Sequence, residues 1–444
     1  MKRKIVMCVA LVLAASIHAQ HQWTLEECIA YARENNITLK KAKLQKQQAE
    51  EEVKGSQAAL LPSLSASTNH SIGYRPWQDN GTTTVTNGMV NTKIDKSYYN
   101  GSYGLNAQWT VWNGNKNRNT LKQNKLTAQQ AELEADVTAN SIQEQIAQLY
   151  VQILYLSEAM KVSEQSLETS KKNEERGQQM LEVGKMSKAD VAQLSAQRAA
   201  DEYSIVDARA NISKYKLQLK QLLELSGSET FDIVIPNTGD QMALADIPSL
   251  QDVYEQALIS RPEMKSGELA VKSSELSIKM AQAGRLPTVS LSGGLGTSTN
   301  SLSNKGWGNQ MKTNFDASAG MTVNIPIFDQ RQTKTATNKA KIQREQALLD
   351  LQDKQKQLYQ TIEGYWLDAE TNQMKLRSAI ATEESEQQSY NLLQEQFQLG
   401  LKNIVELMTG KDKLLNAQQT RLQSKYQTIL AVEMLKFYRG DQKL

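Results

Sequence analysis

The residue types that most often do chemistry are few in this chain and stand far apart. The three histidines and two cysteines are His18, His21, His70, Cys8 and Cys28. Their spacing supports neither a catalytic triad nor a zinc site. Gly-Lys pairs at 184–185 and 410–411 lack the upstream glycine that a phosphate-binding loop requires. We therefore predict that the chain is not an enzyme and holds no cofactor and no metal.

Acidic residues at two matching positions are the remaining chemical feature. The segment Val183-Gly184-x-x-Ser187-x-x-Asp190-Val191 returns 216 positions later as Leu399-Gly400-x-x-Asn403-x-x-Glu406-Leu407. Glycine tolerates the left-handed conformation that closes a helix. Ser187, with Asp190 three residues on, resembles a capping box that starts the next helix. Each segment therefore predicts a helical hairpin with a tight tip.

The two tips belong to a longer duplication. Residues 61–65, Leu-Pro-Ser-Leu-Ser, return as residues 286–290, Leu-Pro-Thr-Val-Ser, and the stretch 24–32 returns as 249–257, both displaced by 225 positions. A fixed order of landmarks in both halves implies one supersecondary unit built twice. Each unit is expected to contain two helices, a strand, a loop, a strand, a very long helix and a second long helix.

The N-terminus and the composition restrict the class of protein. Residues 1–19 begin with basic residues, continue with a short apolar run and end in small residues, which predicts a secretory signal peptide. Its removal leaves Cys28 alone, so no intramolecular disulfide can form. Aromatic residues make up 6% of the chain and the mean hydropathy is −0.54, which suits narrow helix seams better than a broad core. The net charge of +3 is spread along the chain and gives no footprint for nucleic acid.

Two stretches without proline can form long helices. The chain has seven prolines, none of them within 77–235 or 327–444, and proline breaks helix interiors. Over Ile142–Met160 apolar residues alternate in steps of four and three, the period of a coiled-coil seam. A fainter copy of this pattern covers Leu351–Leu376. The first long helix would be on the order of 100 Å in length. We predict two long helical hairpins, over residues 115–225 and 330–438.

Four segments alternate between apolar and small polar residues. The alternation is strict from Tyr99 to Val111 and again from Phe315 to Ile327, which is the period of a β-strand. Shorter alternating segments begin at Leu64 and Val289. We predict strands at about 62–75, 97–112, 287–299 and 313–328.

Two kinds of sheet explain this alternation. One is an antiparallel sheet with one face on a core and one face in water. The other is a membrane barrel, with apolar residues toward lipid, polar residues toward a lumen and aromatic residues at the interfaces. The signal peptide and the absence of charge between Ser97 and Asn115 favour the barrel. The candidates for its aromatic girdle are Tyr98, Tyr99, Trp109 and Trp112.

Four strands cannot close a membrane barrel alone. Open sheet edges in hydrocarbon leave backbone groups unpaired, at a cost of several kcal/mol each. The smallest known membrane barrels have eight strands. Two copies would give eight strands and a filled interior, whereas three would give twelve strands and room for a lumen. We expect three copies, with the long helices forming a barrel of their own.

With these features together, the chain resembles the TolC-like outer-membrane efflux protein family, the outer membrane factors. The resemblance rests on the duplication, on the L-P-x-[LV]-S motif after each second helix and on the G-x-x-[SN]-x-x-[DE]-[VL] tips. It implies a mixed fold, all-α plus membrane β-barrel. In this fold a homotrimer builds a twelve-stranded outer-membrane barrel that continues as a long α-helical barrel. The repeats would span 20–226 and 249–444, with 227–248 as a connector in an equatorial collar.

The resemblance also implies a location and a function. The protein would be a passive exit duct in the cell outer membrane, extending into the periplasm, in a tripartite efflux or type I secretion system. Outer-membrane lipid would surround the sheet, and loop 75–97 would face outside the cell. A periplasmic adaptor (membrane fusion) protein, tied to an inner-membrane efflux pump, would dock at Gly184, Ser187, Gly400 and Asn403. The alternative function is a periplasmic coiled-coil adaptor or scaffold with a small water-facing β domain.

In such channels the coiled inner hairpins close the periplasmic end, and carboxylates ring the narrowest point. The family pattern places one carboxylate of this periplasmic gate at Glu406, but the second falls on Thr409, which weakens the ring. A closed-state link would join Asp190 to Lys402 and to the aromatic residue at Phe397, which lacks the hydroxyl that the family has there. The plain alternatives are two solvated acids, a surface lysine and a packing phenylalanine.

Overall fold

The computed structural model describes two compact units of the chain. The described residues are 22–77, 80–85, 88–93, 95–226, 231–236 and 239–441. The signal segment predicted over 1–19 lies outside them. The helical unit contains residues 22–42, 135–262 and 355–441, and the sheet unit contains residues 43–134 and 263–354.

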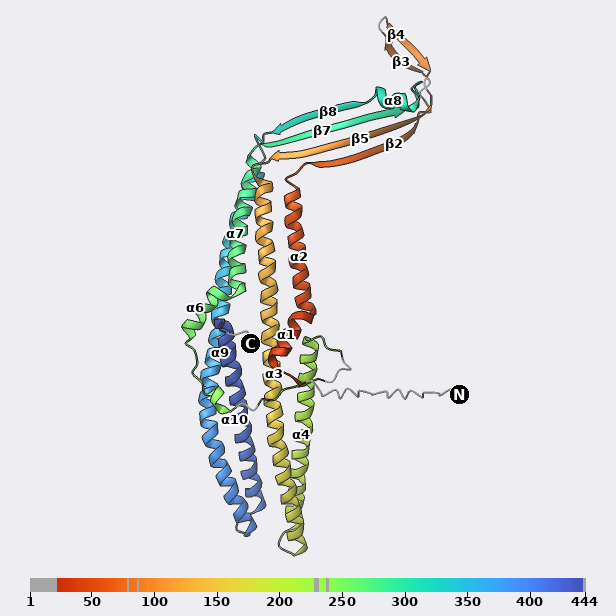
Figure 1. Ribbon diagram of the computed structural model, residues 1–444. Helices are drawn as coiled ribbons and strands as arrows, with labels where there is room; N and C mark the ends of the chain where they lie inside the picture. The colour runs from red at the N-terminus through yellow and green to blue at the C-terminus, as the bar shows by residue number, and fades with distance from the viewer. Residues whose placement is uncertain are drawn as a thin grey trace, which may run out of the picture. The chain divides into compact units, whose positions relative to one another are not determined.

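Two helical hairpins make up most of the helical unit (Figure 1). The first joins α3 (Lys116–Glu182) to α4 (Lys188–Leu222), and the second joins α9 (Gln332–Gln398) to α10 (Ile404–Arg439). Both α3 and α9 have 67 residues, roughly 100 Å at 1.5 Å per residue. They begin within two residues of the predicted positions, and their equal lengths follow from the duplication. No helix among the described residues is both long enough and apolar enough to cross a membrane.

The seams of these helices are buried at the spacing of a coiled coil. In α3 the predicted residues Ile142, Ile146 and Ile153 are buried. In α9 the same spacing continues past Leu376, where the sequence pattern ends, as far as Phe397. The buried apolar residues of α9 in the helical unit are Leu358, Ile362, Ala369, Leu376, Ala379, Tyr390 and Phe397. Narrow seams therefore take the place of a broad core.

Short elements complete the helical unit. β1 (Gln22–Trp23) pairs in parallel with β6 (Asp232–Ile233). The predicted connector 227–248 contains β6 and α5 (Asp240–Ala243). Its residues 227–230 and 237–238 lie outside the described residues. The remaining helices are α1 (Leu25–Asn35), which Thr24 caps, and α6 (Leu250–Ser260), which Ser249 caps.

A four-stranded antiparallel sheet, in the order β2-β5-β7-β8, is the centre of the sheet unit (Figure 1). Its strands are β2 (Ser63–Tyr74), β5 (Ser97–Trp112), β7 (Thr288–Asn300) and β8 (Asp316–Asn324). α2 (Ile37–Ala58) precedes β2, and α7 (Pro262–Gln282) precedes β7. The segment 75–97, predicted as a loop, contains a separate hairpin of β3 (Asn80–Val85) and β4 (Gly88–Lys93).

Two details of the sheet differ from the prediction. The strand predicted over 313–328 is shorter, because α8 (Trp307–Thr313) precedes β8 and the strand ends two residues before a proline. A β-bulge between Thr110 and Trp112 interrupts the alternation of β5. A bulge adds one unpaired residue to a strand, so Trp112 comes to lie opposite Val289.

The register gives the sheet one apolar and one polar face. Leu64, Ala107, Gly293 and Ala319 form one row across all four strands. The apolar face has Leu64, Ala66, Leu105, Ala107, Trp109, Val289, Leu291, Leu295, Ala317, Ala319, Met321 and Val323. The polar face has Ser65, Ser67, Asn69, Ser102, Asn106, Gln108, Ser290, Ser292, Ser298, Asp316, Ser318, Thr322 and Asn324. Large apolar side chains are exposed in the single chain, Leu64 at 75% and Met321 at 68%.

Candidate functional site

Both hairpin tips are built in the same way. Gly184 and Gly400 adopt the left-handed conformation, with φ of 72° and 75°. The amide after each glycine donates to the carbonyl five residues back, at 2.8 Å in the first tip and 2.9 Å in the second. This is the Schellman closure of a helix C-terminus, for which a residue without Cβ is best suited.

A capping box starts each returning helix, as the sequence predicts. The Ser187 hydroxyl accepts from the Asp190 amide at 3.1 Å and donates to the Asp190 carboxylate at 2.8 Å. The Asn403 side chain accepts from the Glu406 amide at 2.9 Å, and the Glu406 carboxylate accepts from the Asn403 amide at 3.2 Å. The tip residues predicted for docking, Gly184, Ser187, Gly400 and Asn403, are all exposed.

Of the four predicted gate residues, the structure brings two together. The Lys402 ammonium lies 2.6 Å from the Glu406 carboxylate. Lys402, and after it the Asn403 amide, lower the pKa of Glu406. The predicted link from Asp190 to Lys402 is not formed within one chain, because Glu406 offers Lys402 a carboxylate one helical turn away. Phe397 is buried and acts as a packing residue.

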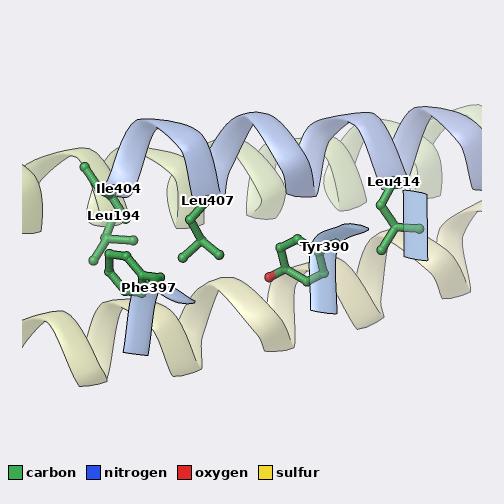
Figure 2. Packing of buried hydrophobic residues seen from close by; sticks show 6 residues of the cluster. All are labelled: Leu194, Tyr390, Phe397, Ile404, Leu407 and Leu414. Atoms are coloured by element: carbon green, nitrogen blue, oxygen red, sulfur yellow. The ribbon is translucent and has the colours of Figure 1, made fainter. Parts of the chain in front are cut away.

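The tips are continuous with a buried apolar cluster drawn from three helices (Figure 2). Its members are Leu194 of α4, Tyr390 and Phe397 of α9, and Ile404, Leu407 and Leu414 of α10. Met186 of the first tip packs against it, so the cluster joins the two hairpins. A Cβ added at Gly410 would lie 2.6 Å from a methyl carbon of Leu393. Gly410 therefore permits the close approach of α9 and α10.

A buried ion pair that the sequence analysis missed joins the same hairpins. The Lys411 ammonium of α10 contacts the Asp201 carboxylate of α4, and both residues are 5% exposed. Ser170 of α3 donates to Asp201 at 2.5 Å and accepts from Lys411. Lys411 and Asp201 each lie seven residues beyond a buried seam residue, Ile404 and Leu194. A charged residue at a seam position is the signal that could have found them.

Three of the four predicted girdle residues lie on the apolar face of the sheet. Tyr99 and Trp109 lie on it directly, and the bulge brings Trp112 onto it. Tyr98 lies on the polar face, where the Arg75 guanidinium carbon is 4.4 Å from its ring centroid. Tyr98 and Tyr99 lie on opposite faces because neighbouring residues of a strand point to opposite sides of the sheet. The role of Tyr98 in an aromatic girdle stays a prediction.

Three other side chains extend the aromatic group around Tyr99. His70 Nδ1 lies 2.6 Å from the Tyr99 hydroxyl oxygen. The Tyr103 ring meets His70 and Trp307 edge to face, with centroids 5.3 Å and 6.2 Å apart. Tyr99 and Trp109 are ten residues apart, roughly 33 Å along β5. A strand tilt of about 40° reduces this separation to about 25 Å, the height of the apolar band of membrane barrels.

Both edges of the sheet are open among the described residues. β2 and β8 each pair with a neighbour on one side only. Across the part of the chain that the structure describes, no three His, Cys, Asp or Glu side chains gather as ligands of a metal ion. The open edges and the exposed apolar face offer surfaces for assembly.

Comparisons with known proteins match this geometry. A family model described as outer membrane efflux protein matches residues 28–224 and 253–441, one range in each repeat. The outer membrane efflux protein BepC of Brucella suis is 23% identical over 418 residues, covering 92% of this chain and 83% of that protein. The outer membrane protein TolC of Vibrio cholerae is 21% identical over 439 residues, covering 98% and 95%. The crystal structure of the Campylobacter jejuni CmeC outer membrane channel has a TM-score of 0.78 at 19% identity, covering 94% of this chain and 85% of that chain.

Proposed function

The chain belongs to the outer membrane efflux protein family and is an outer-membrane exit duct, and on that premise we propose that three copies build the conduit. Their strands form one twelve-stranded barrel and their hairpins form one helical tunnel. The duct passes small molecules or proteins, driven by an inner-membrane pump through a periplasmic adaptor. The family model matches nearly the whole chain. This match favours the duct over the alternative of a periplasmic coiled-coil adaptor or scaffold.

The proposal of a trimer rests on one observation, the unpaired outer edges of the four-stranded sheet. The outer edges of β2 and β8 have no partner strand among the described residues. The apolar face between them is exposed in the single chain. In hydrocarbon each unpaired backbone group costs several kcal/mol, so β8 of one copy must pair with β2 of the next. The polar face then lines the lumen.

The hairpin tips supply a surface for the adaptor. Leu399 and Leu401, on the two sides of Gly400, are 74% and 71% exposed, and Val405 is exposed on the next turn. Val183 is exposed beside the other tip glycine. Large apolar side chains exposed on rigid tips are suited to bury against a partner. We assign this surface to the adaptor.

We also assign the gate of the duct to the tips of the hairpins. Three copies of Glu406, each paired with Lys402, would surround the lumen near the tips. A bond from Asp190 to Lys402 would join neighbouring copies, since it is not made within one chain. Phe397 would hold the second tip against the apolar cluster without a hydrogen bond of its own.

Cross-linking in the membrane tests the trimer. In a Cys28→Ala background, Ser318→Cys on β8 is combined in turn with Ser65→Cys, Ser67→Cys or Asn69→Cys on β2, and a short bifunctional thiol reagent is added. At least one combination should give covalent dimers and trimers on a denaturing gel. The matched control, Asn106→Cys with Gly294→Cys, joins strands already paired within a chain. It should run as a monomer on the denaturing gel. A single-subunit protein that stays soluble without detergent would contradict the proposal.

A further inference from the structure

The strands of the sheet contribute one charged residue to its polar face, and the Arg75 guanidinium, from outside the strands, lies over Tyr98 on the same face. The residues of this face in the described strands β2, β5, β7 and β8 are serine, threonine, asparagine, glutamine, glycine and Tyr98, with one ionisable acid, Asp316. A wall of hydroxyls and amides does not favour ions of either sign. One carboxylate in such a wall therefore has a large influence on which ions approach.

The surroundings of Asp316 leave its carboxylate open. Ser67, Gly104, Gly296 and Asp316 form one row across the four strands. Two of the four positions are glycines, and a Cβ added at Gly296 would meet only a backbone oxygen of Tyr103, at 3.8 Å. Asp316 is exposed and forms no ion pair with any residue that the structure describes. Among the described residues, none covers this charge or pairs with it.

Asp316 also stands at the end of β8 that is remote from α9. It is the first residue of β8, and Asn324 is the last, before the chain enters α9. Eight residues of strand separate the two, roughly 26 Å. The strands β2, β5 and β7 continue past the row of Asp316, as far as Tyr74, Ser97 and Asn300, so in the proposed barrel Asp316 lies inside the lumen.

We propose that Asp316 determines the ion preference of the duct inside its barrel. This inference rests on the proposed trimer, in which three carboxylates meet at one level of a neutral lumen. Rings of acidic side chains favour cations in other channels. Here the ring attracts cations to the exit and repels anions. Cargo with a positive or neutral surface leaves more readily than cargo with a negative one.

Single channels in planar bilayers test the proposal. The reversal potential across a KCl gradient gives the ratio of potassium to chloride permeability. Asp316→Asn should lower this ratio by at least about twofold at 0.1 M salt, and the effect should shrink near 1 M, where screening acts within about 3 Å. Asp316→Glu should keep the ratio, and the neutral exchange Ser318→Asn should not change it.

Two further measurements separate the barrel from the gate. The polycation spermine, added on the sheet side alone, should block the wild type and lose most of this block in Asp316→Asn. Added on the helix side, it should block both proteins equally. Moving the charge by two residues on the same face, with Asp316→Ser and Ser318→Asp together, should restore the preference. A conducting wild type whose ratio and sidedness are unchanged in Asp316→Asn overturns this inference alone. A wild type that forms no trimer and conducts nothing overturns the proposed function as well.

Discussion

The helical unit and the sheet unit place their apolar residues in opposite ways. In the helical unit, Ile146, Ile362 and Leu407 are at most 1% exposed within a single chain. In the sheet unit, Leu64 and Met321 remain mostly exposed, and both outer strands keep one unpaired edge. One chain is therefore sufficient to bury the seams of the hairpins, whereas the sheet needs lipid on one face and neighbours at its edges. The comparison predicts that the same kind of substitution has different consequences in the two units.

The largest effect is expected for a charge on the apolar face of the sheet. Leu295, near the centre of β7, lies between Leu105 and Ala317. Leu295→Arg should reduce the amount of assembled protein in the outer-membrane fraction, because arginine facing lipid at the bilayer midplane costs about 2–4 kcal/mol in each copy. The control Ser292→Arg places the same charge on the polar face and should assemble normally. Equal assembly of the two variants would show that neither face meets lipid.

A smaller effect is expected inside the helical unit. Lys411→Met leaves the buried Asp201 carboxylate without its cation, which should lower the free energy of unfolding by about 3–5 kcal/mol. Adding Asp201→Leu removes the stranded charge and should recover most of this loss. Chemical denaturation of the detergent-solubilised protein, followed by circular dichroism, measures both.

An exposed pair is the control for this buried one. Lys171 lies 3.1 Å from Glu168 on the surface of α3, with side chains 48% and 63% exposed. Lys171→Met should cost at most about 1 kcal/mol. If Lys411→Met and Lys171→Met were equally mild, the ion pair of Lys411 would not be buried in the assembled protein.

The two units also differ in how far the sequence predicts them. The tips were predicted residue by residue, because a glycine closure and a capping box depend on neighbours within six positions. Alternation predicted the faces of the sheet, but not the bulge before Trp112, since one inserted residue leaves no mark in composition. The pair of Lys411 and Asp201 joins residues 210 positions apart. A single charged residue in a helix is usually solvated, so only its seam position could have indicated this pair.

The smallest effect is expected at the tips, the exposed end of the helical unit. The pKa of Glu406 is lowered by the Lys402 ammonium and the Asn403 amide, so the folded state binds its proton less readily than the unfolded state does. Its stabilising contribution is therefore complete above the unfolded pKa and is lost as the pH falls through the lower folded pKa. Glu406→Gln should melt at a lower temperature than the wild type at pH 7, and the two curves should converge toward pH 3. Glu395→Gln removes the same charge from an exposed position of α9 that has no capping role, and it should show no such convergence. A constant difference between Glu406→Gln and the wild type at every pH would mean that Glu406 acts through the shape of the cap, not through its charge.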